Sequence, residues 1–377
     1  MTGPGEAAGP GLGSGRARAR DLGLAPGTLP AGRTNAITDV SGVRVGHATL
    51  IDGNDIRTGV TAIVHDGLLG GTLPAGLSVF NGYGKMTGAT QVAELGQLET
   101  PVLLTSTLSV FRVADALLSY LHELPSRQGV ATLNPVVAET NDGYLSDIWA
   151  RPITSQHVYD ALSGATAGPV AEGCVGAGTG TGALGFKAGV GTSSRVVECR
   201  AAEGAEPARV SVGALVQANF GGELTVAGVP VPAAGPQPGA GPAGGPASPG
   251  SPGQQGEPPG PGGSCVMVLA TDAPLDARSL TRLASRSFAG MARTGSDFSG
   301  QSGDYALAFS TASELAAGDG EGNVPRQDLD LLFRAAIEAT EEAILNSLFM
   351  AVTTRGYRGH VRHAVPLDRV RALVSGR

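Results

Sequence analysis

The stretch GPGGSCVMVLATDAPL, residues 260–275, decides how the fold of this chain is interpreted. A tract rich in proline and glycine ends at Gly263, and Ser264 and Cys265 open a run of apolar residues. A short apolar run bounded by glycine and turn residues is typical of a buried β-strand. The stretch therefore predicts one of two things: a linker that meets a core strand, or a chain that breaks where the strand begins.

The residues on either side of this junction suit self-cleavage. An N-to-O acyl shift needs a hydroxyl or thiol that attacks the preceding carbonyl, and Gly263 removes Cβ crowding there. Cleavage would give Ser264 a free α-amine with a pKa of about 7.7–8, which can act as general base for its own hydroxyl. Because Ser264 and Cys265 point to opposite faces of a strand, at most one is the nucleophile, and the residues alone leave the choice open.

Composition narrows the class of protein. The chain has 377 residues and a net charge of −7, and its length can bury a large core. The acidic balance argues against a nucleic-acid or anionic-membrane partner, and no segment approaches the roughly 20 apolar residues of a membrane span. Three scattered cysteines and an N-terminus without an apolar signal region favour a cytoplasmic location. The short basic cluster of Arg16, Arg18 and Arg20 is expected to be a solvated arm.

Two segments rich in proline and glycine stand apart from the rest of the chain. Residues 1–20 and 230–263 are expected to be disordered, since 22 of the 34 residues in the second segment are Pro or Gly. The remainder of 21–377 is expected to form one domain of layered sheets and helices. The pattern predicts strands at 59–67, 76–84, 264–271 and within 303–313, a hairpin from 193–200 and 208–221, and helices at 110–125, from Asp272 onward, and at 328–352.

Two conspicuous motifs are better explained by packing than by a binding site. The glycine-rich run at 173–191 lacks the G-x-x-x-x-G-K-[ST] pattern, so close backbone packing is a better interpretation than a nucleotide site. His360 and His363 have no carboxylate motif beside them, and surface or packing roles are favoured over metal binding.

A third motif, ETNDGYLSD at 139–147, is a stronger candidate for a functional site. A turn explains Asn141 to Gly143. Glu139 at a strand end could pair with a substrate ammonium, and the Tyr144 phenol could donate to an oxyanion. Asn219, before a glycine pair, could do the same or simply cap a turn.

Taken together, these blocks make the chain resemble the DmpA-like family of L-aminopeptidase/D-esterases and β-peptidyl aminopeptidases. The resemblance covers about residues 20–377 apart from the Pro/Gly tract. The blocks that carry it are RTNAITDVSGVRVGH (33–47), NPVVAETNDGYLSDI (134–148), RVSVGALVQANFG (209–221), and GSCVMVLATDAPL (263–275) leading to SGDYALAFSTA (302–312).

The resemblance implies a four-layer αββα sandwich, similar to N-terminal-nucleophile hydrolases but with different connectivity. It implies cleavage between Gly263 and Ser264 into chains 1–263 and 264–377, no metal or cofactor, and a homotetramer. The roles it implies are Ser264 as nucleophile, Tyr144 and Asn219 as oxyanion donors, Ser302 and Asp304 as proton-transfer partners, and Glu139 and Asn141 as ligands of the substrate amine. Asp304 stands where family members can carry Glu, so its carboxylate lies one methylene further back.

The function expected from the sequence is an autoproteolytically activated serine aminopeptidase acting on small peptides, amides or esters. One alternative is an acyltransferase like ornithine acetyltransferase, although those enzymes use threonine where this chain has Ser264. The other is a non-catalytic binding protein, with the Pro/Gly tract as an interaction arm and the glycine run as a ligand loop.

Overall fold

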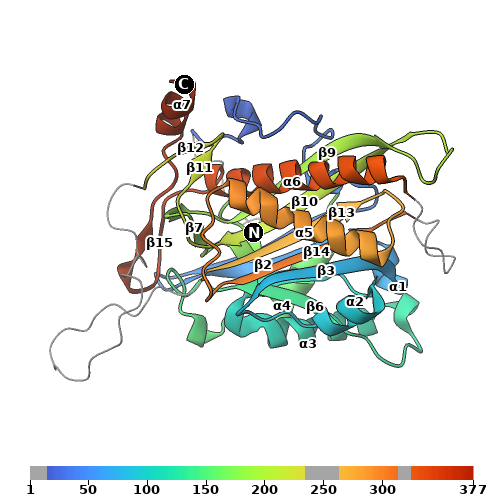
Figure 1. The fold of residues 1–377 in the computed structure, drawn as a ribbon. Coiled ribbons are helices and arrows are strands. Elements are labelled where there is room, and N and C mark those ends of the chain that lie inside the picture. Colours follow the sequence, from blue (N-terminus) through green and yellow to red (C-terminus); the bar gives the residue numbers. More distant parts are fainter. Residues whose placement is uncertain (1–14, 234–262, 313–323, 377) are drawn as a thin grey trace, which may run out of the picture.

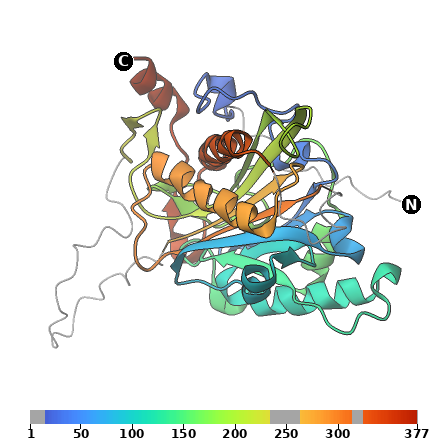
Figure 2. The same cartoon turned by 45° about the vertical axis from the view of Figure 1, so that its right-hand side comes forward.

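The fold is a sandwich of two β-sheets with helices on both outer faces (Figure 1). The computed structural model describes residues 15–233, 263–312 and 324–376. The expectations for residues 1–14 and for most of the Pro/Gly tract lie outside these ranges. Figure 2 shows the four layers in sequence, with one helix pair above the larger sheet and another below the smaller sheet. The predicted αββα architecture is confirmed.

The smaller sheet has four strands in the order β1-β2-β5-β6. Strands β5 and β6 are parallel and the other pairs antiparallel. Helices α3 and α4 cover the outer face. The bounds of these elements are β1 Arg44–Asp52, β2 Ile56–Val64, β5 Val102–Ser106, β6 Val136–Thr140, α3 Val110–His122 and α4 Ser155–Ser163.

The larger sheet has six strands in the order β4-β3-β14-β13-β10-β9, and helices α5 and α6 cover it. The central strand β13 runs parallel to β14 and antiparallel to β10. The bounds are β3 Leu73–Gly82, β4 Gln97–Leu98, β9 Val190–Cys199, β10 Ala208–Asn219, β13 Ser264–Thr271, β14 Gly303–Ser310, α5 Ala277–Arg293 and α6 Arg326–Phe349.

Shorter elements complete the described chain. They are α1 Gly67–Gly70, α2 Ala89–Leu95, α7 Leu367–Ser375, the strand pairs β7 Gly182–Ala183 with β8 Phe186–Lys187, β11 Thr225–Val226 with β12 Val229–Pro230 and β15 Thr354–Arg355 with β16 Val361–Arg362, and several 3₁₀ turns, among them η2 Ile37–Asp39 and η6 Gly176–Gly178. Within the described ranges, no helix combines the length and apolar character needed to cross a membrane.

Side chains of β13 alternate between two apolar cores. Cys265, Met267 and Leu269 pack in the layer under α5 and α6. Val266 and Val268 pack in the layer between the two sheets. This alternation, which follows from strand geometry, turns the Ser264 side chain toward the opposite sheet.

Most predicted elements are present, and one helix start is corrected. The predicted hairpin is the antiparallel pair β9–β10. Helix α5 begins at Ala277, with Asp276 accepting the Ser279 N–H at 2.8 Å, instead of near Asp272. Asp272 accepts the Ser211 N–H at 2.7 Å and so joins the end of β13 to β10.

The expectation of a solvated arginine arm is wrong for the described part of the N-terminus. Arg16 donates to the Val365 carbonyl at 2.8 Å, and Arg18 pairs with the buried Glu172 at 2.7 Å. Arg20 pairs with Glu342 at 2.9 Å. The three side chains therefore tie residues 16–20 to the body of the protein.

The glycine-rich run packs closely against backbone, as the sequence favoured. A Cβ built on Gly189 would lie 1.8 Å from the Gly173 carbonyl oxygen, and one on Gly191 would lie 2.0 Å from the Ala343 carbonyl oxygen. Neither position has room for a side chain, because both obstacles are backbone atoms.

A buried ionic cluster joins β9, α6 and the N-terminal segment. Arg195 has no exposed surface, and it donates to Glu342 at 2.7 Å, to Glu338 at 3.3 Å and to the Pro26 carbonyl at 2.9 Å. The two carboxylates are buried as well. Removing Arg195 would leave the two buried carboxylates with only the partly exposed Arg20 and Arg334 as cationic partners.

We expect Arg195→Ala to lower the free energy of unfolding by about 3–5 kcal/mol, because it removes the fully buried cation that faces two buried carboxylates. Urea unfolding measures the change. Arg293→Ala is the matched control, since it removes a more exposed ion pair with Glu341 at 3.3 Å and should cost no more than about 1 kcal/mol. Equal losses in the two variants would contradict this prediction.

Candidate active site

Ser264 is the first residue of β13 and is only 3% exposed. It lies opposite Asn219 of β10 on one side and Gly303 of β14 on the other. A Cβ built on Gly303 would lie 3.3 Å from the Ser264 hydroxyl oxygen, so glycine leaves the space beside the hydroxyl open. The Gly263 carbonyl accepts the Gly303 N–H at 3.0 Å.

Cys265 is separated from this space. It is fully buried on the helix-facing side of β13, and burial raises the pKa of its thiol well above the usual value. A thiol that is buried and protonated is a poor nucleophile. The choice between the two residues, which the sequence left open, therefore favours Ser264.

Asn219 ends β10 on the same face as Ser264 and joins the two sheets. Its Nδ2 donates to the Asn141 carbonyl at 2.9 Å, and its Oδ1 accepts the Gly182 N–H at 3.1 Å. These contacts fix the amide orientation and leave one Nδ2 hydrogen for a ligand. Asn141 also makes the expected turn, because its Oδ1 accepts the Gly143 N–H at 3.0 Å.

Tyr144 follows this turn and is held by aromatic and cationic neighbours. Its ring stacks on His360 with centroids 4.4 Å apart, and the Arg362 guanidinium carbon lies 4.6 Å from its ring centroid. Arg362 also approaches Gly182, since a Cβ built on this glycine would lie 2.3 Å from the arginine Cδ. Arg362 thus packs near the groups that hold both Tyr144 and Asn219, and His360 has the packing role expected for it.

Ser302 and Asp304 form a buried hydrogen-bonded pair beside the Gly263–Ser264 peptide. The Ser302 hydroxyl donates to Asp304 Oδ1 at 2.7 Å, and Asn81 Nδ2 donates to Oδ2 at 2.9 Å. Burial raises the pKa of Asp304, while these two hydrogen bonds oppose the rise. Asp304 lies opposite Cys265 in the parallel register, on the sheet face away from the Ser264 hydroxyl. Asp304 therefore does not face the Ser264 hydroxyl directly, and its hydrogen-bond partner Ser302 directly precedes Gly303, the residue opposite Ser264.

Glu139 lies near the end of β6 and is 2% exposed. Its Oε1 accepts the Lys85 backbone N–H at 3.2 Å and lies 3.5 Å from Lys85 Nζ. Burial raises the pKa of Glu139, and the Lys85 charge opposes the rise. The side chain lies two residues before Asn141, so the predicted amine ligands lie on one segment next to Asn219.

Asp142 is a further buried carboxyl on the same segment. It is 1% exposed, accepts the Ser106 hydroxyl at 2.7 Å, and burial raises its pKa to about 6. The Leu145 and Ser146 N–H groups bond to its backbone carbonyl at 3.1 and 3.0 Å. These contacts hold the turn that carries Asn141 and Tyr144.

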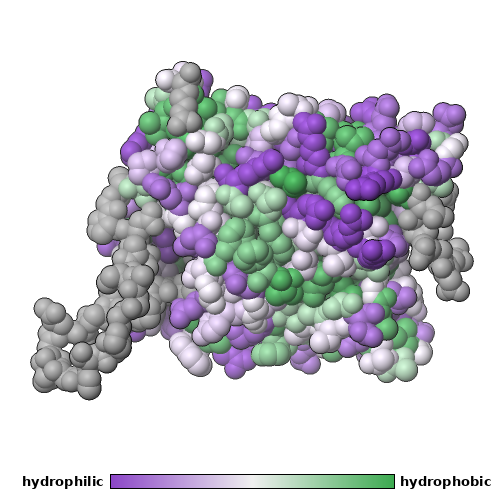
Figure 3. Space-filling view, in the orientation of Figure 1, coloured by the Kyte–Doolittle hydropathy of each residue, from purple (hydrophilic) through white to green (hydrophobic). Residues whose placement is uncertain are grey.

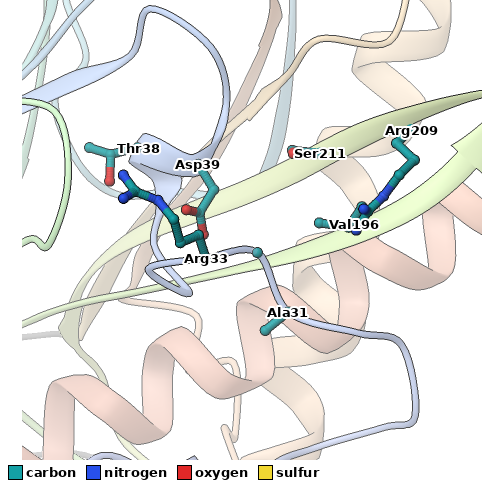
Figure 4. Close-up of a pocket in the computed structure, with 8 residues that line it drawn as sticks. Ala31, Arg33, Thr38, Asp39, Val196, Arg209 and Ser211 are labelled. Carbon is teal, nitrogen blue, oxygen red and sulfur yellow. The ribbon is translucent and has the colours of Figure 1, made fainter.

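A separate cavity of about 620 Å³ lies away from Ser264. Figure 4 shows Arg33 and Asp39 on the N-terminal segment and Arg209 and Ser211 on β10 across from them. Asp39 bonds to Thr34 and Ser194, both at 2.7 Å, so its carboxylate is engaged in holding the fold. The lining residues include none of the predicted site residues.

The layers and the site together define the class. A four-layer αββα sandwich that presents a serine at the start of its central strand, beside an amide donor and a buried serine–carboxylate pair, is the architecture of an N-terminal-nucleophile type of hydrolase. The pattern of peptidase family S58 matches residues 35–362, and the chain belongs to that family.

Similarity to its relatives identifies the chain as an aminopeptidase rather than an acyltransferase or a binding protein. It is 40% identical over 376 residues to the β-peptidyl aminopeptidase BapA of Sphingosinicella microcystinivorans, covering 95% of this chain and 92% of that protein. The β-aminopeptidase structure from Burkholderia sp. superposes with a TM-score of 0.81 at 40% identity, covering 96% of this chain and 99% of that one.

A third similarity extends to the L-aminopeptidase D-Ala-esterase/amidase of Ochrobactrum anthropi. It superposes with a TM-score of 0.80 at 35% identity, covering 95% of this chain and 98% of that one. Its structure is described as a variant of the Ntn hydrolase fold. The resemblance inferred from the sequence is confirmed at the level of family and fold.

Three residues near the site escaped the sequence reasoning. Lys85 contacts Glu139, and Arg362 contacts Tyr144. The third, Tyr305, is 6% exposed, its pKa is raised by burial, and the charges of Glu139 and Asp304 act on it from two sides. No motif marks Lys85 or Arg362. Tyr305 directly follows Asp304 in the block SGDYALAFSTA, which was a usable signal.

We expect Ser302→Ala and Asp304→Asn each to lower kcat/KM by about 10²–10⁴-fold, because the carboxylate acts through the serine hydroxyl. The double variant should be no slower than the slower single variant, since the two groups work as one unit. Steady-state kinetics on the processed fraction, quantified by intact mass, provides the measurement. Additive losses in the double variant would contradict the coupling.

Proposed function

We propose that the chain cleaves itself between Gly263 and Ser264 and then uses Ser264 to release N-terminal residues from small peptides, amides or esters. The hydrogen bond from the Gly303 N–H to the Gly263 carbonyl carries this proposal. It polarises the carbonyl that the adjacent Ser264 hydroxyl would attack. Glycine at 263 and at 303 keeps both sides of the reacting atoms free of side chains.

The proposed cleavage has two steps, an acyl shift and an ester hydrolysis. The Ser264 oxygen attacks the Gly263 carbonyl carbon, its hydroxyl proton passes to the leaving nitrogen, and the C–N bond breaks to leave an ester and a new α-amine. Water then hydrolyses the ester, which regenerates the hydroxyl and leaves a carboxylate on Gly263. The products are chains 1–263 and 264–377.

Turnover would use the same groups. The α-amine of Ser264 accepts the hydroxyl proton as the oxygen attacks the substrate carbonyl. The Asn219 amide and the Tyr144 phenol donate to the developing oxyanion. Because the Ser302 hydroxyl hydrogen is donated to Asp304, its oxygen lone pairs are free to accept a hydrogen bond from the protonated α-amine. An acyl-enzyme forms on the serine oxygen, and water hydrolyses it.

Glu139 and Asn141 would hold the free amine of the substrate. The buried Glu139 carboxylate supports this role, since a buried anion gains most from a cationic partner. The names of the relatives describe β-peptidyl and L-amino-acid substrates. Because two relatives at 40% identity are named β-peptidyl aminopeptidases, we include substrates with an N-terminal β-amino acid in the proposal.

Assembly and location form a further part of the proposal. We expect a homotetramer, as the family resemblance implied, and a cytoplasmic location, as the sequence favoured. Val79 and Phe80 of β3 are 49% and 55% exposed, and Figure 3 shows apolar surface on the face that carries β3 and α5. Such surface would favour association between copies. Light scattering of the purified protein measures the assembly.

We expect Ser264→Ala to give one uncut chain without aminopeptidase activity, because it lacks the attacking oxygen. Cys265→Ala is the matched control one residue away, and it should give two chains with most of the activity, since its thiol faces the helix layer. Intact mass of the denatured proteins and hydrolysis of β- and α-amino-acid p-nitroanilides provide the measurements. A second chain beginning at Cys265, or an active uncut Ser264→Ala protein, would overturn the assignment.

We expect Glu139→Gln to raise KM for free-amine substrates by roughly 10–100-fold, because a hydrogen bond to a charged group contributes about 1.5–3 kcal/mol. Self-cleavage should continue, since it involves no free amine at that position. Kinetics at fixed pH and intact mass measure the two effects separately. An unchanged KM would remove Glu139 from the amine site.

A further inference from the structure

The segment Tyr83–Met86 crosses the site from one sheet to the other. Its start is fixed on the larger sheet, where the Tyr83 N–H donates to the Ser302 carbonyl at 3.2 Å. Its end is fixed on the smaller sheet, where Met86 forms a β-bridge with Ala138. Lys85 is therefore held beside Glu139 by the backbone on both sides, and its position does not depend on its flexible side chain alone.

The ammonium of Lys85 has a mixed environment. It lies 3.5 Å from Glu139 Oε1 and donates to the Thr107 hydroxyl at 2.8 Å. Its side chain is 39% exposed, whereas that of Glu139 is 2% exposed. The cation can move toward solvent while the anion cannot.

Only one oxygen of the carboxylate is engaged. Oε1 receives both contacts from Lys85, and Oε2 is buried without a hydrogen bond from any described residue. The Thr107 hydroxyl faces the carboxylate but does not bond to Oε2. A buried, unbonded carboxylate oxygen is costly unless a donor reaches it. The substrate amine is such a donor.

We propose that Lys85 is a positioning residue for substrate recognition: it is the internal counterion that keeps Glu139 ionised in the free enzyme, so that Oε2 is ready for the ammonium of the substrate. This inference rests on the proposed amine site at Glu139. It adds a second cation to that site, and it assigns the two carboxylate oxygens to different partners.

The other charges around Glu139 show in which direction the loss of Lys85 shifts the pKa of Glu139. Asp142 on the same loop and Tyr305 on β14 face it, and the negative charge of Asp142 disfavours ionisation of Glu139. Burial raises the pKa of Glu139, and Lys85 is the cation that lowers it. Without Lys85, the pKa of Glu139 rises further, and the carboxylate is protonated over a wider range of acidic pH.

The acid side of the kcat/KM profile reports ionisations of the free enzyme, and the α-amine of Ser264 sets the break nearest neutral pH. Protonation of Glu139 adds a second loss, so Glu139 sets the steeper limb at lower pH. In Lys85→Met we expect this limb to move to higher pH, and kcat/KM on the limb should fall about tenfold for each pH unit by which the limb moves. The loss should fall mainly on KM and should diminish above the limb. Lys85→Arg is the matched control, because it keeps the charge, and its limb should stay near that of the wild type.

A second measurement does not depend on turnover. Infrared difference spectra across the acidic range detect the carbonyl band of a protonated carboxyl. The band of Glu139, identified by its absence in Glu139→Gln, should appear at higher pH in Lys85→Met than in the wild type. Glu139→Gln retains Asp142, so the subtraction separates the two carboxyls.

The outcomes separate this inference from the proposed function. Superimposable profiles and spectra for wild type and Lys85→Met would overturn the role of Lys85, as would equal shifts in Lys85→Met and Lys85→Arg. If no free-amine substrate is hydrolysed but the infrared shift is present, the proposed function fails and the counterion role stands. If both the hydrolysis and the infrared shift are missing, the proposed function and the counterion role both fail.

Discussion

Alternation of side chains along β13 is the constraint on which the rest of the site depends. The strand lies in the centre of the larger sheet, and each face must pack against a different apolar layer. Even-numbered residues face the second sheet, so Ser264 enters the space between the sheets while Cys265 is sealed under the helices. A one-residue shift in register would exchange them and place the Cys265 thiol where the hydroxyl belongs.

The site exists because hydrogen bonds join the two sheets at this end of the sandwich. Asn219 on the larger sheet donates to the Asn141 carbonyl that follows β6 on the smaller sheet. On the other side, the segment after β3 crosses between the same two sheets and brings Lys85 to Glu139. The proposed nucleophile and the proposed amine ligands therefore come from different sheets, and the relative position of the sheets sets the distance between them.

Sequence patterns predicted the features that depend on neighbouring residues in the chain. The bounds of β13 and the position of Asn219 at a strand end follow from apolar runs bounded by glycine, and the structure agrees. The arginine cluster was misjudged because its main acceptors are distant in the chain: Val365 is 349 residues from Arg16, and Glu172 is 154 residues from Arg18. The contact of Lys85 with Glu139 was missed for the same reason, since it depends on how two sheets stack and not on spacing along the sequence.

The two buried carboxylates beside Ser264 differ in a way that assigns them different tasks. Burial raises the pKa of both Glu139 and Asp304. Both oxygens of Asp304 accept hydrogen bonds from side chains of the fold, Ser302 and Asn81, so this carboxylate has its partners without a ligand. Glu139 has one unbonded oxygen, and a buried anion in that state gains most from a cation that arrives with the substrate. The distribution of hydrogen-bond donors, more than the identity of the carboxylates, thus separates the group proposed to assist proton transfer from the group proposed to recognise the amine.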